Sequence, residues 1–244
     1  MIIGISGRMG HGKNTVADII EKLCLTNNGP KFEQKAFAGK LKQIASILTG
    51  IPVEKFEDQE FKKSFLNVEW GTVQDIPLNS IPPFADMQFN VMMSVREFIQ
   101  KLGTEAMRDG LHTNVLVNAL FADYKTSSIV EEKRGDNLVW SRDVYPNWII
   151  TDMRFPNEME AVVERKGITI KVVKDCSECG GIGYHKMSCS KQYKKEHSSE
   201  TSLDKAKFNY EIINDAGIPE LIEKVRKILI KEELMINGQF HKDN

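Results

Sequence analysis

Short apolar runs alternate along the chain with segments whose apolar residues recur at helical spacing. Residues 2–6 (IIGIS) form a short apolar run, which predicts a buried strand. The spacing of Val16, Ile19 and Ile20 then predicts a helix over residues 13–25. The chain therefore begins with a strand, a glycine-rich connection and a helix.

The same two patterns continue to the end of the sequence. Further strands are predicted over residues 31–37, 148–152, 168–173 and 210–215. Further helices are predicted over residues 38–50, 94–102, 114–124, 157–167 and 218–234. Gly50 is placed to end the first of these helices, and Gly103 to break or turn the second. Because strands alternate with helices, we expect an α/β fold with a parallel sheet covered on both faces.

Three segments interrupt this alternation. Residues 52–90 hold four of the eight prolines and are expected to be irregular, as an inserted lobe or a long loop. Residues 126–146 are polar and charged, and we expect a flexible excursion there. Residues 174–200 are rich in Cys, Gly, Ser and Lys and are interpreted as an inserted lid. We expect one domain over residues 1–244 that carries these three insertions.

Charge and hydropathy exclude several classes of protein. The net charge of −1 argues against bulk electrostatic binding to nucleic acid or to a membrane surface. The amino terminus has no basic segment followed by a long apolar one, so we expect no secretion signal. No apolar run approaches the ~20 residues of a membrane-spanning helix. We therefore expect a soluble, globular, cytoplasmic protein.

The first connection, GISGRMGHGKNT at residues 4–15, has the spacing of a phosphate-binding P-loop. In such a loop, glycines let backbone N–H groups turn toward phosphate oxygens, the helix N-terminus adds partial positive charge, and the lysine neutralises the terminal phosphates. The alternative is a glycine turn with a solvated lysine. The residues expected to bind the nucleotide are Gly7, Gly10, His11, Gly12, Lys13, Asn14 and Thr15.

The end of this motif departs from the general pattern. Asn14 follows Lys13 where the pattern has a serine or threonine, and the hydroxyl comes one position later, at Thr15. This GKxT ending resembles nucleoside monophosphate kinases more than GTPases or motor ATPases. Magnesium in that group is held largely through nucleotide phosphates and water. The hydroxyl of Thr15 is nevertheless a candidate for the magnesium site.

Two further segments carry candidate polar groups. Asp152 ends the apolar run WIITD, at the edge of the sheet where open α/β folds bind ligands, and Arg154 follows two residues later. The alternative is an aspartate that caps the next helix and an arginine that pairs with Glu158. On the helix from residue 94, Arg96 and Gln100 are about one turn apart and are candidates for a phosphate contact and a base contact. The alternative is that Arg96 and Glu97 are ordinary solvated charges.

Taken together, these motifs resemble the bacteriophage deoxynucleoside monophosphate kinases. The resemblance covers most of the chain through GxxxxGKNT, REFIQKLGTEAMRD, TDMRFPNEMEAV, HSSE at 197–200, and IINDAG followed by a terminal helix. It implies a P-loop kinase-like parallel sheet flanked by helices, with inserted substrate-binding and lid segments. It also implies the host cytoplasm as the location if the protein is phage-encoded.

The resemblance further implies transfer of the γ-phosphoryl group of ATP to a deoxynucleoside monophosphate, with ATP and Mg²⁺ as cofactors. The residues that it implies for catalysis are Lys13, Arg108, Asp152 and Arg154. Those that it implies for substrate binding are Arg96, Gln100, Thr104, Arg108, Arg154, His197 and Glu200. The turn at Asn214–Gly217 lies where related kinases hold adenine, so the resemblance implies Asn214 for nucleotide binding. Since the acceptor phosphate is already anionic, the reaction needs positioning and charge neutralisation rather than a general base.

A cysteine cluster within residues 174–200 predicts a metal site. The sequence CSECGGIGYHKMSC offers three thiolates and an imidazole, a normal tetrahedral set for structural zinc. The predicted ligands are Cys176, Cys179, His185 and Cys189. His197 is a rival fourth ligand, and a loop of reduced cysteines is the alternative.

Two other functions stay open at this point. One is a P-loop kinase for another small anionic acceptor, such as a coenzyme precursor. The other is a nucleotide-dependent protein that reads nucleic acid through the cysteine-rich insert, although the near-neutral charge argues against it. The base that is accepted, the discrimination between deoxyribose and ribose, and whether the protein is a homodimer cannot be read from the sequence.

Overall fold

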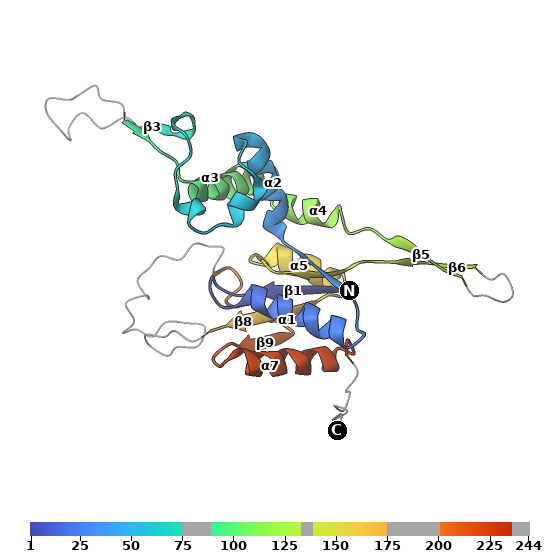
Figure 1. The fold of residues 1–244 in the computed structure, drawn as a ribbon. Helices are drawn as coiled ribbons and strands as arrows, with labels where there is room; N and C mark the ends of the chain where they lie inside the picture. Colours follow the sequence, from blue (N-terminus) through green and yellow to red (C-terminus); the bar gives the residue numbers. More distant parts are fainter. Residues whose placement is uncertain (75–88, 133–138, 175–200, 236–244) are drawn as a thin grey trace, which may run out of the picture. The chain divides into compact units, whose positions relative to one another are not determined.

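A five-stranded parallel sheet organises the amino- and carboxyl-terminal parts of the chain (Figure 1). The structure, a computed structural model, describes residues 1–74, 89–132, 139–174 and 201–235. Its strands are β1 (Ile2–Ser6), β2 (Phe32–Lys35), β7 (Asn147–Ile150), β8 (Ile168–Val173) and β9 (Tyr210–Ile213). They are ordered β2-β7-β1-β8-β9, and each neighbouring pair is parallel. The expected α/β class is therefore confirmed.

The chain divides into two compact units. The first unit comprises residues 1–37 and 119–244 and contains this sheet, whereas the second unit comprises residues 38–118. In the first unit, β1 is the central strand. The connection that follows β1 leads to β2 on one side of it, whereas the connection that follows β8 leads to β9 on the other side. Neighbouring strands with oppositely directed connections create a crevice at their carboxyl ends, so the β1–β8 edge is the expected ligand position.

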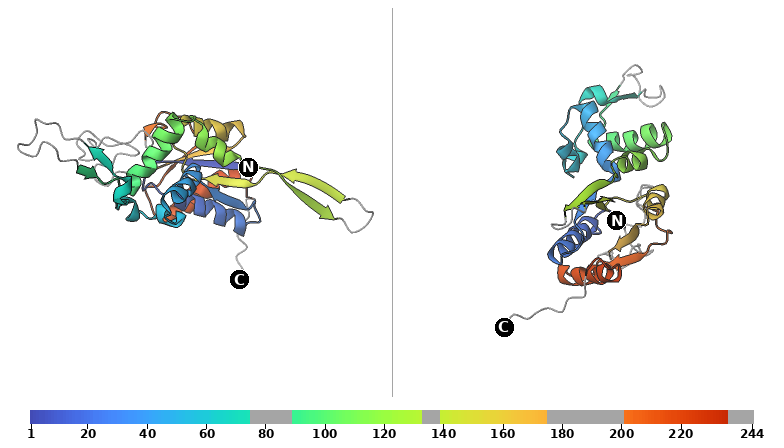
Figure 2. Two further views of the ribbon diagram at one scale, coloured as in Figure 1. Left: turned by 90° about the horizontal axis from the view of Figure 1, so that it is seen from above. Right: turned by 90° about the vertical axis from the view of Figure 1, so that its right-hand side faces the viewer.

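Helices cover both faces of the sheet in the first unit. The helices α1 (Lys13–Thr26) and α7 (Ile218–Lys231) bury their apolar faces against Ile3 and Ile5 of β1 in one core cluster. The opposite face is covered by α5 (Pro156–Glu164), where a Cβ on Gly4 would approach the side chains of Met153 and Val162. The right-hand view of Figure 2 shows α1 and α7 on the side of the sheet away from α5.

The segment over residues 126–146, which is predicted to be a flexible excursion, forms a pair of strands in its described part. It contains β5 (Ser127–Glu132) and β6 (Val139–Val144), which pair antiparallel with Ser127 opposite Val144 and Glu132 opposite Val139. The sequence analysis did not predict these strands, because it weighed the polar composition above the β-branched and aromatic residues Ile129, Val130, Val139 and Trp140, which stand on either side of the turn residues Gly-Asp-Asn at 135–137.

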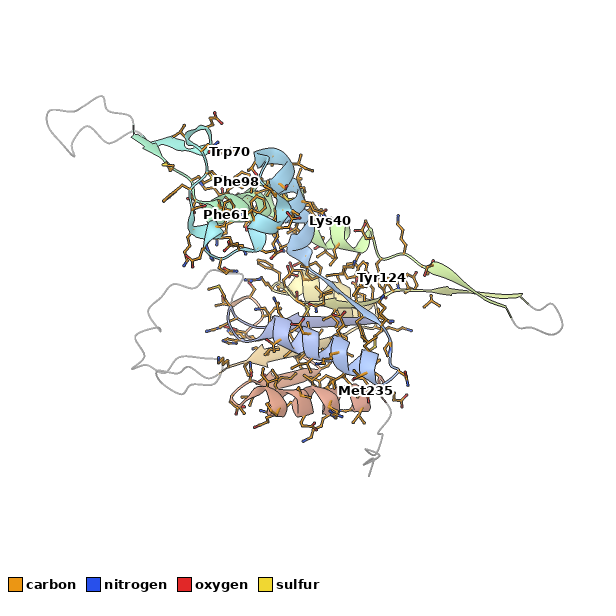
Figure 3. The ribbon with its side chains drawn as sticks, viewed as in Figure 1. Lys40, Phe61, Trp70, Phe98, Tyr124 and Met235 are labelled. Carbon is orange, nitrogen blue, oxygen red and sulfur yellow. The ribbon has the colours of Figure 1, made fainter. Side chains whose placement is uncertain are left out.

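The second unit is built from helices and a small antiparallel pair. Its elements, with the helices that lead into and out of it, are α2 (Phe37–Thr49), the 3₁₀ turns η1 (Val53–Glu57), η2 (Phe61–Lys63) and η3 (Val68–Trp70), β3 (Thr72–Gln74), β4 (Phe89–Val91), α3 (Val95–Lys101), the π-helix η4 (Leu102–Asp109) and α4 (Val115–Phe121). The described part of residues 52–90, which is predicted to be irregular, contains these three short 3₁₀ turns and the short strands β3 and β4. Within the second unit, Phe56, Val95 and Phe98 are buried in one cluster. Trp70 packs edge-on against Phe98, with 5.0 Å between the ring centroids (Figure 3).

Gly103 does not end the helix that contains it. The helix α3 continues as η4, where the amide of Gly110 donates to the carbonyl of Glu105 and that of His112 to Met107, both at 3.0 Å. These five-residue spacings widen the helix without breaking it. Gly103 is buried, and a Cβ there would lie 2.7 Å from Leu41 Cδ2, so the glycine serves close packing rather than termination.

Candidate phosphate-binding site

The connection between β1 and α1 has the backbone that an anion cradle requires. Gly10 and Gly12 have φ angles of +81° and +95°, a left-handed conformation that glycine adopts without steric cost. Gly12 is the N-cap of α1, no side chain caps that end of the helix, and its first turn contains no acidic residue. The positive end of the helix dipole can therefore interact with an anion that binds at the loop.

Lys13 extends across the loop that precedes it. Its Nζ atom donates to the carbonyl oxygens of Gly7 at 2.5 Å and Arg8 at 2.9 Å, so the ammonium group lies at the loop backbone. The next two residues are in the first turn of α1, where Asn14 is exposed and Thr15 is half-buried. The loop, the helix end and the lysine thus place positive charge at one position beside the central strand.

A pocket lies at the β1–β8 edge of the sheet. Its lining includes Gly7, Arg8, His11, Arg154, Lys171 and Asp204. Arg8 forms an ion pair with Asp204 at 3.0 Å, and the backbone carbonyl of Asp204 accepts from Lys171 at 3.3 Å. Since three cationic side chains line the pocket with one carboxylate, its charge suits a polyanion.

Asp152 lies just beyond the carboxyl end of β7, the strand next to β1. Its Oδ1 atom accepts from the backbone amide of Phe37, the first residue of α2, at 2.7 Å. The carboxylate therefore binds the start of α2, a contact that neither interpretation of the sequence included. Asp152 is half-buried at the edge of the sheet that carries the glycine loop between β1 and α1.

Glu158 supports the main chain at a candidate site residue, Arg154, a role that the sequence analysis did not assign to it. Its side chain is 2% exposed, and its Oε2 atom accepts from the backbone amides of Arg154 at 2.7 Å and Phe155 at 3.1 Å. The carboxylate therefore fixes the main chain at Arg154 from the first turn of α5. Proline followed two residues later by glutamate at a helix start is the capping signal that could have identified this role.

The arginine-bearing helix lies in the second unit. Arg96 donates from Nη2 to Gln59 Oε1 at 3.3 Å, and Gln100 is exposed on the same helix, α3. Thr104 and Arg108 are half-buried on η4, the π-helical continuation. Within this unit, the four predicted substrate-binding residues belong to one continuous helix.

Asn214 lies close to the glycine loop between β1 and α1, in the first unit. Its Nδ2 atom donates to the carbonyl oxygen of His11 at 3.0 Å, although the two residues are far apart in the sequence. The other predicted residues, Cys176, Cys179, His185, Cys189, His197 and Glu200, lie outside the described residues. Within the part of the chain that is described, no three His, Cys, Asp or Glu side chains gather as a metal site would require.

The geometry of the first unit defines the class of protein. A parallel sheet flanked by helices, with a glycine loop and lysine at its central strand, is an α/β fold of the P-loop kinase type. Over residues 1–74, 89–132, 139–174 and 201–235, no helix has the length and apolar character needed to cross a membrane.

Comparisons with known proteins point in the same direction. No protein-family model matches the chain. The chain is similar to the deoxynucleoside-5'-monophosphate kinase of Escherichia phage T5, with 22% identity over 240 residues that cover 88% of this chain and 89% of that protein. This distant similarity over most of both chains indicates a kinase-like protein and suggests a phosphotransferase.

Proposed function

We propose that the protein is a deoxynucleoside monophosphate kinase that transfers the γ-phosphoryl group of ATP to a deoxynucleoside 5'-monophosphate. The observation that carries this proposal is the phosphate loop, in which left-handed glycines, a helix end without a side-chain cap and the Lys13 ammonium group converge. The similarity to a phage kinase of that activity over most of the chain supports the choice of acceptor.

The residues of the loop fit a triphosphate. A Cβ on Gly10 would meet no atom within 4 Å, so there is open space beside the loop backbone. The loop amides and Lys13 would hold the terminal phosphates of ATP, and Arg8, Arg154 and Lys171 would neutralise charge in the adjoining pocket. Mg²⁺, when bound with the nucleotide, would supply further charge neutralisation near Thr15 and Asp152, whose oxygens suit that ion.

The chemical step requires little beyond positioning. A phosphate oxygen of the acceptor forms a new bond to the γ-phosphorus while the bond from that phosphorus to the β–γ bridging oxygen breaks, and ADP leaves. The attacking oxygen is already anionic at neutral pH, so no proton has to be removed. Accordingly, the basic side chains of the site act by orienting two anions and by lowering their mutual repulsion.

A phosphorylation assay with each common deoxy- and ribonucleoside monophosphate, with ATP as donor, tests the proposal. We expect ADP formation that depends on a deoxynucleoside monophosphate. ADP formation only with another small anionic acceptor, such as a coenzyme precursor, would contradict the proposed acceptor while keeping a P-loop kinase. Retention on DNA that falls with salt, without any phosphorylation, would instead favour the nucleic-acid-binding alternative.

Arg108→Ala is expected to weaken use of the monophosphate. Loss of a charge-assisted contact to phosphate corresponds to about a 10- to 100-fold rise in KM for the deoxynucleoside monophosphate, with little change in KM for ATP. Steady-state kinetics with each substrate varied in turn measure both values. Lys101→Ala is the matched control, because Lys101 lies seven residues before Arg108 on the same continuous helix and pairs with Glu97 at 3.2 Å. An effect of Arg108→Ala confined to ATP would reject the assignment.

The cysteine cluster predicts a structural metal independently of the reaction. We expect the purified protein to contain about one zinc per chain, bound by Cys176, Cys179, His185 and Cys189. Metal analysis by mass spectrometry should show this zinc and its loss in Cys179→Ser. Cys24→Ser should retain it, because Cys24 is buried on α1, where burial raises the pKa of its thiol to about 11. Protein never exposed to chelators that contains no zinc would reject the site.

A further inference from the structure

The loop after β9 is joined to the phosphate loop by one side chain. The backbone amide of Asn214 donates to the carbonyl of Val173, at the end of β8, at 2.8 Å. Its side-chain amide then donates to the carbonyl oxygen of His11 at 3.0 Å. Asn214 is half-buried, and both of its contacts are to backbone atoms at the carboxyl edge of the sheet.

Gly12 leaves the room that this contact needs. A Cβ at position 12 would lie 2.6 Å from Asn214 Nδ2, closer than real Cβ atoms approach a neighbour. The φ angle of Gly12, +95°, is also in the left-handed region. Gly12 therefore meets two demands, the turn into α1 and the close approach of the Asn214 carboxamide.

The contact fixes the direction of a loop N–H group. A trans peptide is planar, with its carbonyl oxygen and amide hydrogen on opposite sides. Because Asn214 holds the carbonyl of His11, the N–H of Gly12 in the same peptide unit must point away from Asn214. The orientation of loop N–H groups is what decides whether such a loop can bind phosphate oxygens.

The segment that carries Asn214 is itself anchored to α7. Lys224 donates to the carbonyl of Ile213 at 2.7 Å and to Asp215 Oδ1 at 2.8 Å, and it pairs with Glu220 at 3.1 Å. The hydrogen bond from Lys224 lowers the pKa of the Asp215 carboxyl, so this contact persists at neutral pH and is lost as the pH falls through that lowered pKa. Asn214 thus lies between two residues that α7 holds in place.

We propose that Asn214 is a positioning residue for the phosphate loop, which orients the His11–Gly12 peptide for the polyphosphate of the nucleotide rather than recognising its base. The inference rests on the proposed function, because it requires the loop to bind a nucleoside triphosphate. It predicts that removing the carboxamide weakens binding of any polyphosphate to this loop, whether or not a base is attached.

Binding of inorganic tripolyphosphate and of ATP, each with Mg²⁺, to the wild type and to Asn214→Ala tests the proposal by titration calorimetry. Loss of one hydrogen bond corresponds to about a 3- to 10-fold weaker affinity, and we expect the same factor for both ligands. Binding of the deoxynucleoside monophosphate should not change. Should Asn214→Ala fail to fold, Asn214→Ser carries the same comparison, because its side chain is too short to reach His11.

Asn209→Ala is the matched control. The Asn209 carboxamide accepts from the backbone amide and hydroxyl of Thr169 at 2.8 and 2.9 Å, so its loss affects the sheet but not the loop. We expect it to lower Tm and to leave tripolyphosphate affinity unchanged. Weaker ATP binding by Asn214→Ala with unchanged tripolyphosphate binding would mean a base contact and overturn the inference, as would no change for either ligand. A wild type that binds neither ligand would instead overturn the proposed function.

Discussion

Lys13→Ala is expected to lower kcat/KM at least about 100-fold, the usual cost of removing one preorganised donor from the reacting group. The Lys13 ammonium group is held at the loop by the carbonyl oxygens of Gly7 and Arg8, so its charge is in place before the nucleotide binds. Alanine removes that charge and leaves the helix backbone unchanged. Steady-state phosphorylation with ATP and the preferred monophosphate measures the effect.

Lys22→Ala separates this effect from a general loss of positive charge. Lys22 is an exposed residue of the same helix, α1, and its replacement should change neither kcat nor Tm measurably. Thermal unfolding should show that Lys13→Ala is folded at the assay temperature. Near-normal turnover by a folded Lys13→Ala protein would contradict the phosphate-binding role of the loop.

The features that sequence reasoning predicted correctly are those with strong local causes. The run Ile2–Ser6 and the apolar face of α1 are each determined by residues within a few positions, and both form as predicted. The alternation of strands and helices predicted a parallel sheet but not the order of its strands, since sequence patterns do not say which strands become neighbours. The placement of β7 between β2 and β1 required the folded structure.

The features that sequence reasoning missed depend on distant or competing interactions. The contact between Asn214 and His11 joins residues that are 203 positions apart, and no local pattern encodes it. Gly103 has the local character of a helix breaker, yet the space beside Leu41 determines its role. The buried carboxylate of Glu158 was considered only as a partner of the Arg154 side chain, and its hydrogen bond from the backbone amide of Arg154 was not predicted.

Gly7→Ala is expected to destabilise the fold by about 3 kcal/mol, the upper end of the cost of overpacking a close contact. The pairing of Ser6 with Lys171 continues β1 along β8, so Gly7 lies beside Val172. A Cβ at position 7 would overlap the backbone carbonyl oxygen of Val172, which cannot rotate away as a side chain can, and the φ angle of Gly7, +152°, adds backbone strain like that at Gly10. The same carbonyl is 3.2 Å from Nδ1 of His11, so moving it also disturbs the phosphate loop. We therefore expect a lower Tm together with weaker binding of tripolyphosphate.

Gly10→Ala is the control in the same loop, because the new Cβ would meet no atom within 4 Å. Its φ angle of +81° makes alanine there cost about 1 kcal/mol of left-handed backbone strain, without a clash. If close packing against β8 sets the loop conformation, Gly7→Ala must lose more thermal stability and more tripolyphosphate affinity than Gly10→Ala. Equal losses in the two variants would mean that the glycines matter only for backbone freedom, and that the contact with Val172 does not shape the site.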